Sequence, residues 1–186
     1  MIKLNCGAGV GPLSGWINID LEKSPGVDLI VDLGAGLPFA DASVDFIHSE
    51  DFLSCLPRIE QVRCFLREAR RVLRPAGCMR LLLPSLERLT QAWRERPDWL
   101  VEQWRKSVGL PLDPPTAGHL VNLALKLNPG FFFDRETLER LVGEAGFRLR
   151  EVEFGRSGHA PLRDIDLRHP AQSVSVYYEC DPLPAR

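Results

Sequence analysis

Three glycines at alternate positions, Gly7, Gly9 and Gly11, follow an apolar strand predicted at the start of the chain. Glycine lets the backbone turn tightly and lets a ligand approach without a Cβ in the way. A second short strand, residues 16–20, is predicted to end at Asp20, whose carboxylate can accept hydrogen bonds from a ribose diol. The combination predicts a nucleoside-binding site. The alternative is a structural turn followed by an acid that caps a turn or helix.

The spacing within this stretch restricts the kind of nucleoside site. Gly11 and Asp20 are nine positions apart, whereas dinucleotide-binding folds place the acid ~20 residues after the glycines. Nine positions are too few for a turn, a full helix and a strand, so the first helix is predicted to be missing or reduced to one turn. An NAD-dependent oxidoreductase, which holds a pyrophosphate at that helix N-terminus, is therefore disfavoured.

The elements that must position these residues alternate along the chain. Further strands are predicted at 27–32, 43–49, 78–84, 147–154 and 174–178, and helices at 57–73 and 135–145. Strands alternating with helices indicate an α/β fold with a doubly wound sheet. A slip in the apolar alternation between Leu149 and Val152 predicts a bulge.

Residues 85–133 do not fit a strand–helix unit. Helical pieces are predicted at 86–95 and 98–108, followed by an apolar segment at 120–127 and the aromatic run 131–133. The segment follows the fifth strand, where open α/β sheets bind ligands. We interpret it as a cap or lid on the substrate side of a single domain spanning 1–186.

Composition indicates an ordinary soluble protein. Of the 186 residues 45% are hydrophobic and 26% are charged, and the net charge of −2 gives no clear nucleic-acid signal. Its five cysteines form no C-x-x-C pair, and His119, His159 and His169 lack ligand spacing, so we expect no metal site and a cytoplasmic location. No apolar run approaches the ~20 residues of a membrane span, and no N-terminal signal precedes the strand at Ile2. Oligomeric state is left open.

The segment Leu4–Gly11 resembles the first motif of class I S-adenosylmethionine (SAM)-dependent methyltransferases. Together with Gly15–Asp20 it resembles, more narrowly, a group of short predicted methyltransferases of the type 11 kind, and Glu68–Gly77 continues the similarity. The resemblance implies a mostly parallel, seven-stranded Rossmann-like sheet of order 3-2-1-4-5-7-6. Asn5 departs from it, because the superfamily usually has an acid there and a neutral amide contacts the cofactor's ammonium group more weakly.

The resemblance also implies a set of site residues. The implied cofactor is SAM, and the implied cofactor-binding residues are Asn5, Gly7, Gly9, Gly11, Asp20, Asp32, Leu33 and His48. Asp32 would lie at the adenine edge, and residues 37–39 would belong to the loop that holds that ring. With the first helix reduced, the methionine end is expected to rely on loop amides of residues 6–11 and on His48 or Ser49.

The catalytic residues are less defined. His48, Glu50 and Asp51 follow the fourth strand, where methyltransferases keep such residues, and each is a candidate general base or an ordinary cap. Related sequences often show H-x-x-E-H here, but this chain has Ser54 and Cys55 in place of the final Glu-His pair of that pattern. The resemblance implies methyl transfer to an unidentified acceptor (EC 2.1.1.-). The alternative is a non-catalytic SAM-binding or scaffolding protein on the same fold.

Overall fold

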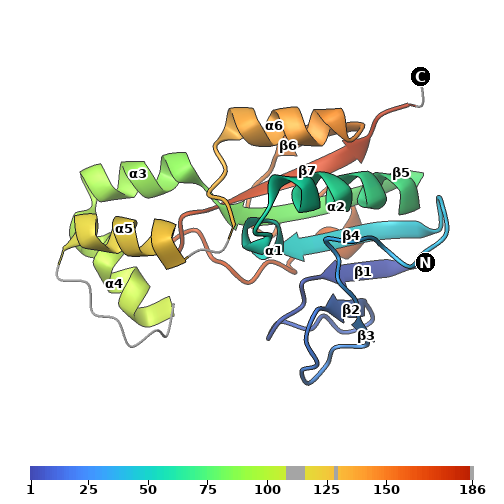
Figure 1. Ribbon diagram of the computed structural model, residues 1–186, viewed down its shortest axis with the longest axis horizontal. Helices are drawn as coiled ribbons and strands as arrows, with labels where there is room; N and C mark the ends of the chain where they lie inside the picture. Colours follow the sequence, from blue (N-terminus) through green and yellow to red (C-terminus); the bar gives the residue numbers. More distant parts are fainter. Residues whose placement is uncertain (108–115, 128–129, 185–186) are drawn as a thin grey trace.

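The computed structural model describes residues 1–107, 116–127 and 130–184. Their strands form one mixed sheet of order β3-β2-β1-β4-β5-β7-β6 (Figure 1). The strands are β1 (Lys3–Cys6), β2 (Ile17–Asp20), β3 (Leu29–Ile30), β4 (Val44–Glu50), β5 (Leu73–Pro84), β6 (Phe147–Glu151) and β7 (Ser175–Pro182). Strand β7 runs antiparallel between β5 and β6, and β1 to β5 pair in parallel. The seven-stranded sheet and its order are thereby confirmed.

The helices follow the apolar periodicity of the sequence. They are α1 (Phe52–Cys55), α2 (Ile59–Val72), α3 (Leu86–Glu95), α4 (Pro97–Ser107), α5 (Ala117–Leu127) and α6 (Arg135–Glu144), with a short 3-10 turn η1 (Ala160–Leu162). Asp134 caps α6 by accepting the N–H of Thr137 at 2.9 Å. Between β1 and β2 the chain forms turns and no helix, which confirms the reduced first helix. No helix in the described part of the chain is long and apolar enough to cross a membrane.

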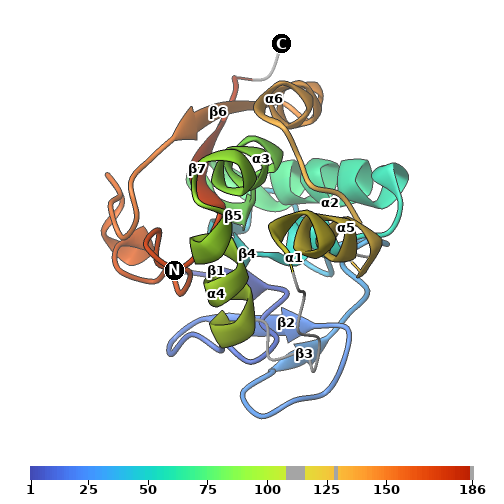
Figure 2. The ribbon, with the colours of Figure 1, turned by 90° about the vertical axis from the view of Figure 1, so that its left-hand side faces the viewer.

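The two faces of the sheet are covered differently. Leu4, Ile47 and Met79 point to the face that α2 and α6 cover, and they share one large apolar core with those helices. The opposite face is covered by the segment 152–174 between β6 and β7 (Figure 2). There Leu162 packs with Trp16 and Cys78 in a separate cluster. In the described residues, helices therefore cover one face of the sheet. A loop segment covers the other face, where a doubly wound fold has its second helical layer.

The described residues of the segment 85–133 after β5, here called the insertion, form a separate group of helices. Leu89 and Ala92 of α3 pack against Leu100 of α4 and Leu120 of α5 in a cluster of their own. This group extends from the carboxyl end of β5, beyond the ends of the strands (Figure 1). The helix expected at 98–108 is α4, and residue 108 lies outside the described residues.

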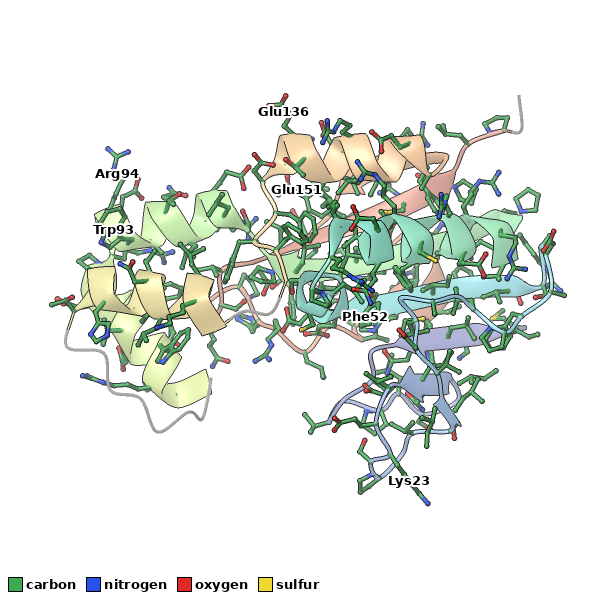
Figure 3. All side chains as sticks on the ribbon, viewed as in Figure 1. Lys23, Phe52, Trp93, Arg94, Glu136 and Glu151 are labelled. Carbon is green, nitrogen blue, oxygen red and sulfur yellow. The ribbon has the colours of Figure 1, made fainter. Side chains whose placement is uncertain are left out.

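Side chains on the outer side of the insertion are solvated. Trp93 and Arg94, at the end of α3, both point into solvent (Figure 3). Phe133, at the end of the insertion, is buried and belongs to the main core. The insertion is thus anchored to the main core at its end, while one outer side of it faces solvent.

Several local expectations were wrong, and strand β3 covers only Leu29–Ile30 of the expected 27–32. Strand β5 begins at Leu73, earlier than the expected residue 78, because the chain pairs with β4 at Val44 before the register shifts. The predicted bulge between Leu149 and Val152 is absent, since β6 pairs with β7 in unbroken register. The apolar alternation slips there because β6 ends at Glu151 on the edge of the sheet.

Candidate functional site

A cavity of about 660 Å³, here called the first cavity, lies at the carboxyl ends of β1, β2 and β4. The cofactor-binding residues proposed from the sequence all line it: Asn5, Gly7, Gly9, Gly11, Asp20, Asp32, Leu33 and His48. Glu50 and Asp51, the other candidate bases, line it as well. The structure thus brings together in one place groups that the sequence spreads over more than forty positions.

The glycine loop after β1 is bonded closely to its own chain. Gly7 and Gly9 have positive φ angles of 74° and 49°, and a Cβ on Gly7 would lie 2.4 Å from the Cβ of Phe52. The N–H groups of Gly7 and Ala8 both donate to the carbonyl of Ile19, at 2.9 and 3.0 Å. These amides are therefore engaged, contrary to the expectation that they would serve a ligand.

Asp20 ends β2 and holds the rim of the first cavity. Its Oδ2 accepts the N–H of Gly9 at 2.7 Å, and its Oδ1 accepts the N–H groups of Leu21 at 2.7 Å and Glu22 at 3.3 Å. A carboxylate offers about four lone-pair positions. Asp20 therefore keeps acceptor capacity for a ligand hydroxyl while it fixes the loop that faces the ligand.

His48 of β4 is part of a buried polar network beneath the cavity. Asn5 donates through Nδ2 to the Oδ1 of Asn18 at 2.9 Å and to the carbonyl of Gly11 at 3.0 Å. Its Oδ1 is thus left to accept from the Nδ1–H of His48 at 3.0 Å, a tautomer that we assign from the network. The buried Nε2 of His48 and Oγ of Ser49 have no hydrogen-bond partner among the described residues, and the carboxylate of Glu50 lies 3.8 Å from that Nε2. His48 therefore presents a buried, unpartnered acceptor nitrogen.

Burial lowers the pKa of His48 to about 4, and this effect outweighs that of the negative charge of Asp166, which raises the pKa. The unfolded chain takes up this proton near pH 6.5, and the folded chain only near pH 4. The contribution of His48 to stability is therefore complete above pH 6.5 and is lost as the pH falls toward 4.

We expect the free energy of unfolding to rise with pH between about 4.5 and 6.5 by up to ~1.4 kcal/mol more per pH unit in the wild type than in His48→Gln. Urea unfolding at several pH values measures this difference. Burial raises the pKa of the neighbouring Glu50 carboxyl, but that titration is common to both proteins. Equal slopes in the two proteins would contradict a buried, neutral His48.

Of the residues after β3 that were expected at the adenine ring, only some lie at the first cavity. Asp32 and Leu33 line the first cavity, and Asp32 accepts the N–H of Gly34 at 2.9 Å. Residues 37–39 do not line it. The guanidinium of Arg71 on α2 instead holds their carbonyls, those of Leu37 at 2.9 Å and Phe39 at 2.8 Å. The loop expected at the adenine ring is thus a support between the sheet and α2.

The segment 152–174 contributes two lining residues that sequence reasoning missed. The N–H groups of Leu167 and Arg168 donate to the carboxylate of Glu50, at 3.1 and 2.8 Å. The Nε of Arg168 donates to Asp51 at 2.9 Å. Both Leu167 and Arg168 line the first cavity. No periodicity or motif marks this polar segment, so only the folded chain shows that it completes the site.

A buried arginine on β5 fixes that segment to the sheet. Arg80 and Asp166 form an ion pair in which both side chains are 0% exposed. Arg80 also donates to the carbonyls of Glu153 at 3.1 Å and Arg156 at 2.9 Å, and it lies 3.4 Å from Glu179. Because Asp166 directly precedes Leu167, this network determines where the two missed lining residues lie.

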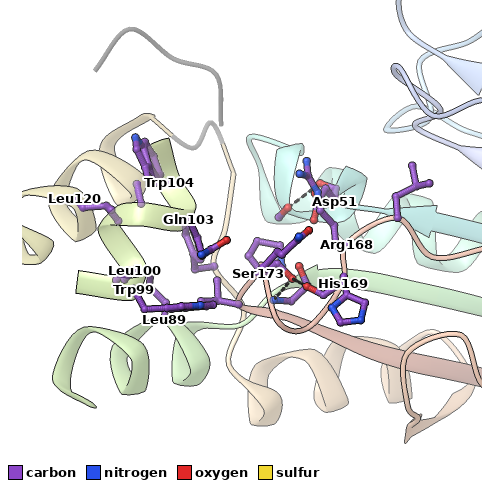
Figure 4. Close-up of a pocket in the computed structure, with 18 of the residues that line it drawn as sticks. Asp51, Leu89, Trp99, Leu100, Gln103, Trp104, Leu120, Arg168, His169 and Ser173 are labelled. Carbon is purple, nitrogen blue, oxygen red and sulfur yellow. Dashed lines mark hydrogen bonds and ion pairs between the residues drawn. The ribbon is translucent and has the colours of Figure 1, made fainter. Parts of the chain in front are cut away.

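A second cavity of about 410 Å³ lies beside the first, between the insertion and the segment 152–174 (Figure 4). Asp51, Cys55, Leu167 and Arg168 line both cavities. The ion pair of Arg168 with Asp51 thus stands in a wall that the two cavities share.

One group of possible metal ligands lies away from both cavities. Ligand atoms of Cys78, His159 and Asp181 lie within 4.8 Å of one another, although the sequence suggested that His159 is isolated. Asp181 already pairs with Arg148 at 3.3 Å and Arg150 at 3.7 Å. Burial, with Glu179 and Asp181 nearby, raises the pKa of the Cys78 thiol, which opposes the thiolate that a metal needs.

The comparison with protein families agrees with the geometry. A family model described as a methyltransferase domain matches residues 14–81, which span β2 to the middle of β5. No curated protein matches the sequence. The family match and the fold confirm the resemblance of this chain to class I methyltransferases.

Several solved structures that resemble this fold are described as methyltransferases, and their sequence identity to this chain is low. A SAM-dependent methyltransferase from Thermotoga maritima is 19% identical with a TM-score of 0.58, covering 97% of this chain and 82% of its own. One from Methanosarcina mazei is 20% identical with a TM-score of 0.57, covering 97% and 92%. The 1,6-didemethyltoxoflavin-N1-methyltransferase of Burkholderia thailandensis, solved with bound 1,6-didemethyltoxoflavin and S-adenosylhomocysteine, is 14% identical with a TM-score of 0.57, covering 98% and 71%.

Proposed function

We propose that this chain is a SAM-dependent methyltransferase, in which the first cavity holds the cofactor and the second receives the methyl acceptor. The observation that carries the proposal is that one cavity collects the glycine loop, Asp20, Asp32 and His48 from separate strands. The methyltransferase-domain match supports the reaction class. In this proposal residues 85–133 are the cap over the acceptor, within a single domain.

The charges of the first cavity suit this cofactor. Its acidic lining residues are Asp20, Asp32, Glu50 and Asp51, and among the described lining residues Arg168 is the one basic side chain besides the neutral His48. SAM carries positive charge on its sulfonium and ammonium groups and negative charge on one carboxylate. An acidic pocket with a single cation is complementary to that distribution.

The residues can be assigned to parts of the cofactor by their free hydrogen-bonding groups. Asp20 has acceptor capacity for the ribose diol. The unpartnered Nε2 of the neutral His48 can accept from the ammonium group, in place of the acid that Asn5 replaces. Arg168 uses only its Nε among the described residues, so its terminal nitrogens are available to the carboxylate.

Asp51 is the candidate base that the two cavities favour. His48 and Glu50 line only the first cavity, whereas Asp51 lines both. When bound, SAM supplies a methyl group that its positive sulfur makes electrophilic. Burial raises the pKa of the Asp51 carboxyl, so this carboxylate can accept the proton that the acceptor's oxygen or nitrogen loses as it gains the methyl group.

We expect Asp51→Asn to lower the rate of methyl transfer about a hundredfold, the usual effect of removing a general base, and to lower SAM affinity by much less, because asparagine keeps an acceptor oxygen for the Nε of Arg168. Label transfer from methyl-labelled SAM into a small-molecule extract identifies the acceptor fraction and gives the rate. Glu60→Gln, an exposed carboxylate on α2, is the control. An undiminished rate in Asp51→Asn would reject Asp51 as the base.

A second candidate function is a non-catalytic SAM-binding protein. It is favoured by the loop after β1, whose N–H groups already donate to other groups of the chain. The N–H groups of Gly7, Ala8, Gly9 and Gly11 all donate within the chain, which leaves few fixed donors to align a cofactor. Isothermal titration with SAM and S-adenosylhomocysteine, followed by the label assay, separates the two functions. Binding without transfer to any fraction indicates the binding protein, and a flat titration rejects both.

A further inference from the structure

We propose that the second cavity binds a small, uncharged aromatic molecule as the methyl acceptor. Its ring would lie against the insertion, and its accepting oxygen or nitrogen would face the wall shared with the first cavity. The inference deepens the proposed function and rests on it, because it names the class of acceptor.

The side of the cavity formed by the insertion is apolar and rich in rings. It is lined by Leu89, Trp99, Leu100, Trp104, Leu120 and Phe132. Flat rings pack against such side chains by offset stacking and edge-to-face contact, beyond the effect of the buried area alone. The volume of about 410 Å³ lies within the range of small-molecule sites. These features indicate that the ligand is a compact ring compound. The cavity is too small to hold a folded protein.

The charges of the cavity cancel. Asp51 and Arg168 are its acidic and basic lining residues, and they pair with each other at 2.9 Å. The other titratable groups there are Cys55 and His169, whose Nδ1 accepts the N–H of Ala171 at 3.1 Å. With Asp51 paired to Nε of Arg168, and the terminal nitrogens of Arg168 assigned to the carboxylate of SAM, a phosphate or carboxylate on the acceptor would meet no further arginine or lysine among the described lining residues, and a cation would meet no unpaired carboxylate. The cavity therefore favours an uncharged molecule.

Most of the polar lining lies on the opposite side; the exceptions on the insertion side are Gln103 and the indole N–H of Trp104, which has no hydrogen-bond partner among the described residues. Figure 4 shows Asp51, Arg168, His169 and Ser173 across the cavity from Leu89, Trp99, Leu100 and Leu120. A molecule with an apolar ring and one polar edge therefore has a single favoured orientation. That orientation directs the polar edge toward Asp51, the proposed base.

Contacts within the chain join the two sides of the cavity. Trp99 donates through Nε1 to the carbonyl of Ala171 at 3.3 Å, which joins the insertion to the segment 152–174. The guanidinium of Arg96 lies 4.2 Å from the centre of the Trp99 ring. Tyr177 of β7 donates its hydroxyl to the carbonyl of Arg168. These contacts hold the apolar and the polar side at a fixed separation, so binding requires little ordering.

The test uses 2-naphthol as an uncharged aromatic probe, titrated calorimetrically into the full chain, with and without SAM. Ala124 of α5 lines the cavity and is 5% exposed, so Ala124→Phe should fill the space. The control is Leu125→Phe at the next position, which is 51% exposed and does not line the cavity. We expect Ala124→Phe to weaken 2-naphthol binding at least tenfold and Leu125→Phe to leave it unchanged. The anionic 2-naphthoate should bind the wild type at least tenfold more weakly than 2-naphthol.

The outcomes separate this inference from the proposed function. Undetectable 2-naphthol binding, binding that survives Ala124→Phe, or preferred binding of 2-naphthoate overturns the inference, while SAM binding by the same samples leaves the proposed function standing. Absent SAM binding with intact 2-naphthol binding rejects the methyltransferase and keeps an aromatic site. Thermal melting checks that each variant folds, and Gln103→Trp, at a half-buried lining position, replaces Ala124→Phe if that variant does not.

Discussion

Replacing Arg80 by methionine is expected to lower the free energy of unfolding by about 3–5 kcal/mol, because one partner of a buried ion pair is removed. Methionine fills much of the same space but leaves the carboxylate of Asp166 buried without its cation. Glu179 is less affected, since Arg150 still lies 2.6 Å from it. The destabilisation should therefore come mainly from Asp166.

Urea unfolding of the variants measures this effect. Arg148→Met, at a β6 position whose arginine side chain is 69% exposed, should cost less than about 1 kcal/mol and serves as the control. The double variant Arg80→Met with Asp166→Asn should recover part of the loss, because it removes the uncompensated charge. A cost for Arg80→Met as small as that of Arg148→Met would contradict the role of this pair.

The same variant links the buried network to the site. Asp166 precedes Leu167 and Arg168, which contact Glu50 and Asp51 at the first cavity. Where Arg80→Met still folds, we therefore expect weaker SAM binding, although Arg80 lies in neither cavity lining. Stability and binding are coupled here through the position of one loop segment.

The parts of the site that the sequence predicted are those with a local signature. The glycine loop and Asp20 are separated by nine positions in one strand–turn–strand unit, and the strand order came from the resemblance. Leu167 and Arg168 could not be predicted, because the polar segment around them has no periodicity. Its position depends on a pairing between Arg80 and Asp166, which are 86 positions apart.

The same reasoning explains why residues 37–39 do not line the first cavity. Their sequence matched a family pattern for the adenine loop, but a pattern does not show which partner a backbone carbonyl has. In the folded chain Arg71 binds the carbonyls of Leu37 and Phe39, and Glu68 accepts the N–H of Leu37 at 3.0 Å. A match to a loop motif therefore fixed the place of the segment along the chain without fixing its contacts.

Replacing Asp20 by alanine is expected to weaken SAM binding about tenfold to a hundredfold, the value of hydrogen bonds to a charged group. The loss has two sources, since Asp20 would hold the ribose diol and also accepts the N–H of Gly9 at 2.7 Å. Asp20→Asn keeps one acceptor oxygen and should lose less. Isothermal titration measures each affinity, and Glu22→Gln, exposed and outside the cavity lining, is the control.

Adenosine separates the ribose contact from the rest of the cofactor. The wild type should bind SAM in the micromolar range or more weakly, with adenosine retaining most of that affinity, because the amides of Gly7, Ala8, Gly9 and Gly11 are already engaged within the chain. Asp20→Ala should then weaken adenosine and SAM by the same factor, and 2′,3′-dideoxyadenosine by much less, since it lacks the diol. Equal losses for adenosine and its dideoxy analogue would assign the whole effect to the loosened glycine loop, and unchanged SAM affinity would reject Asp20 as a cofactor residue.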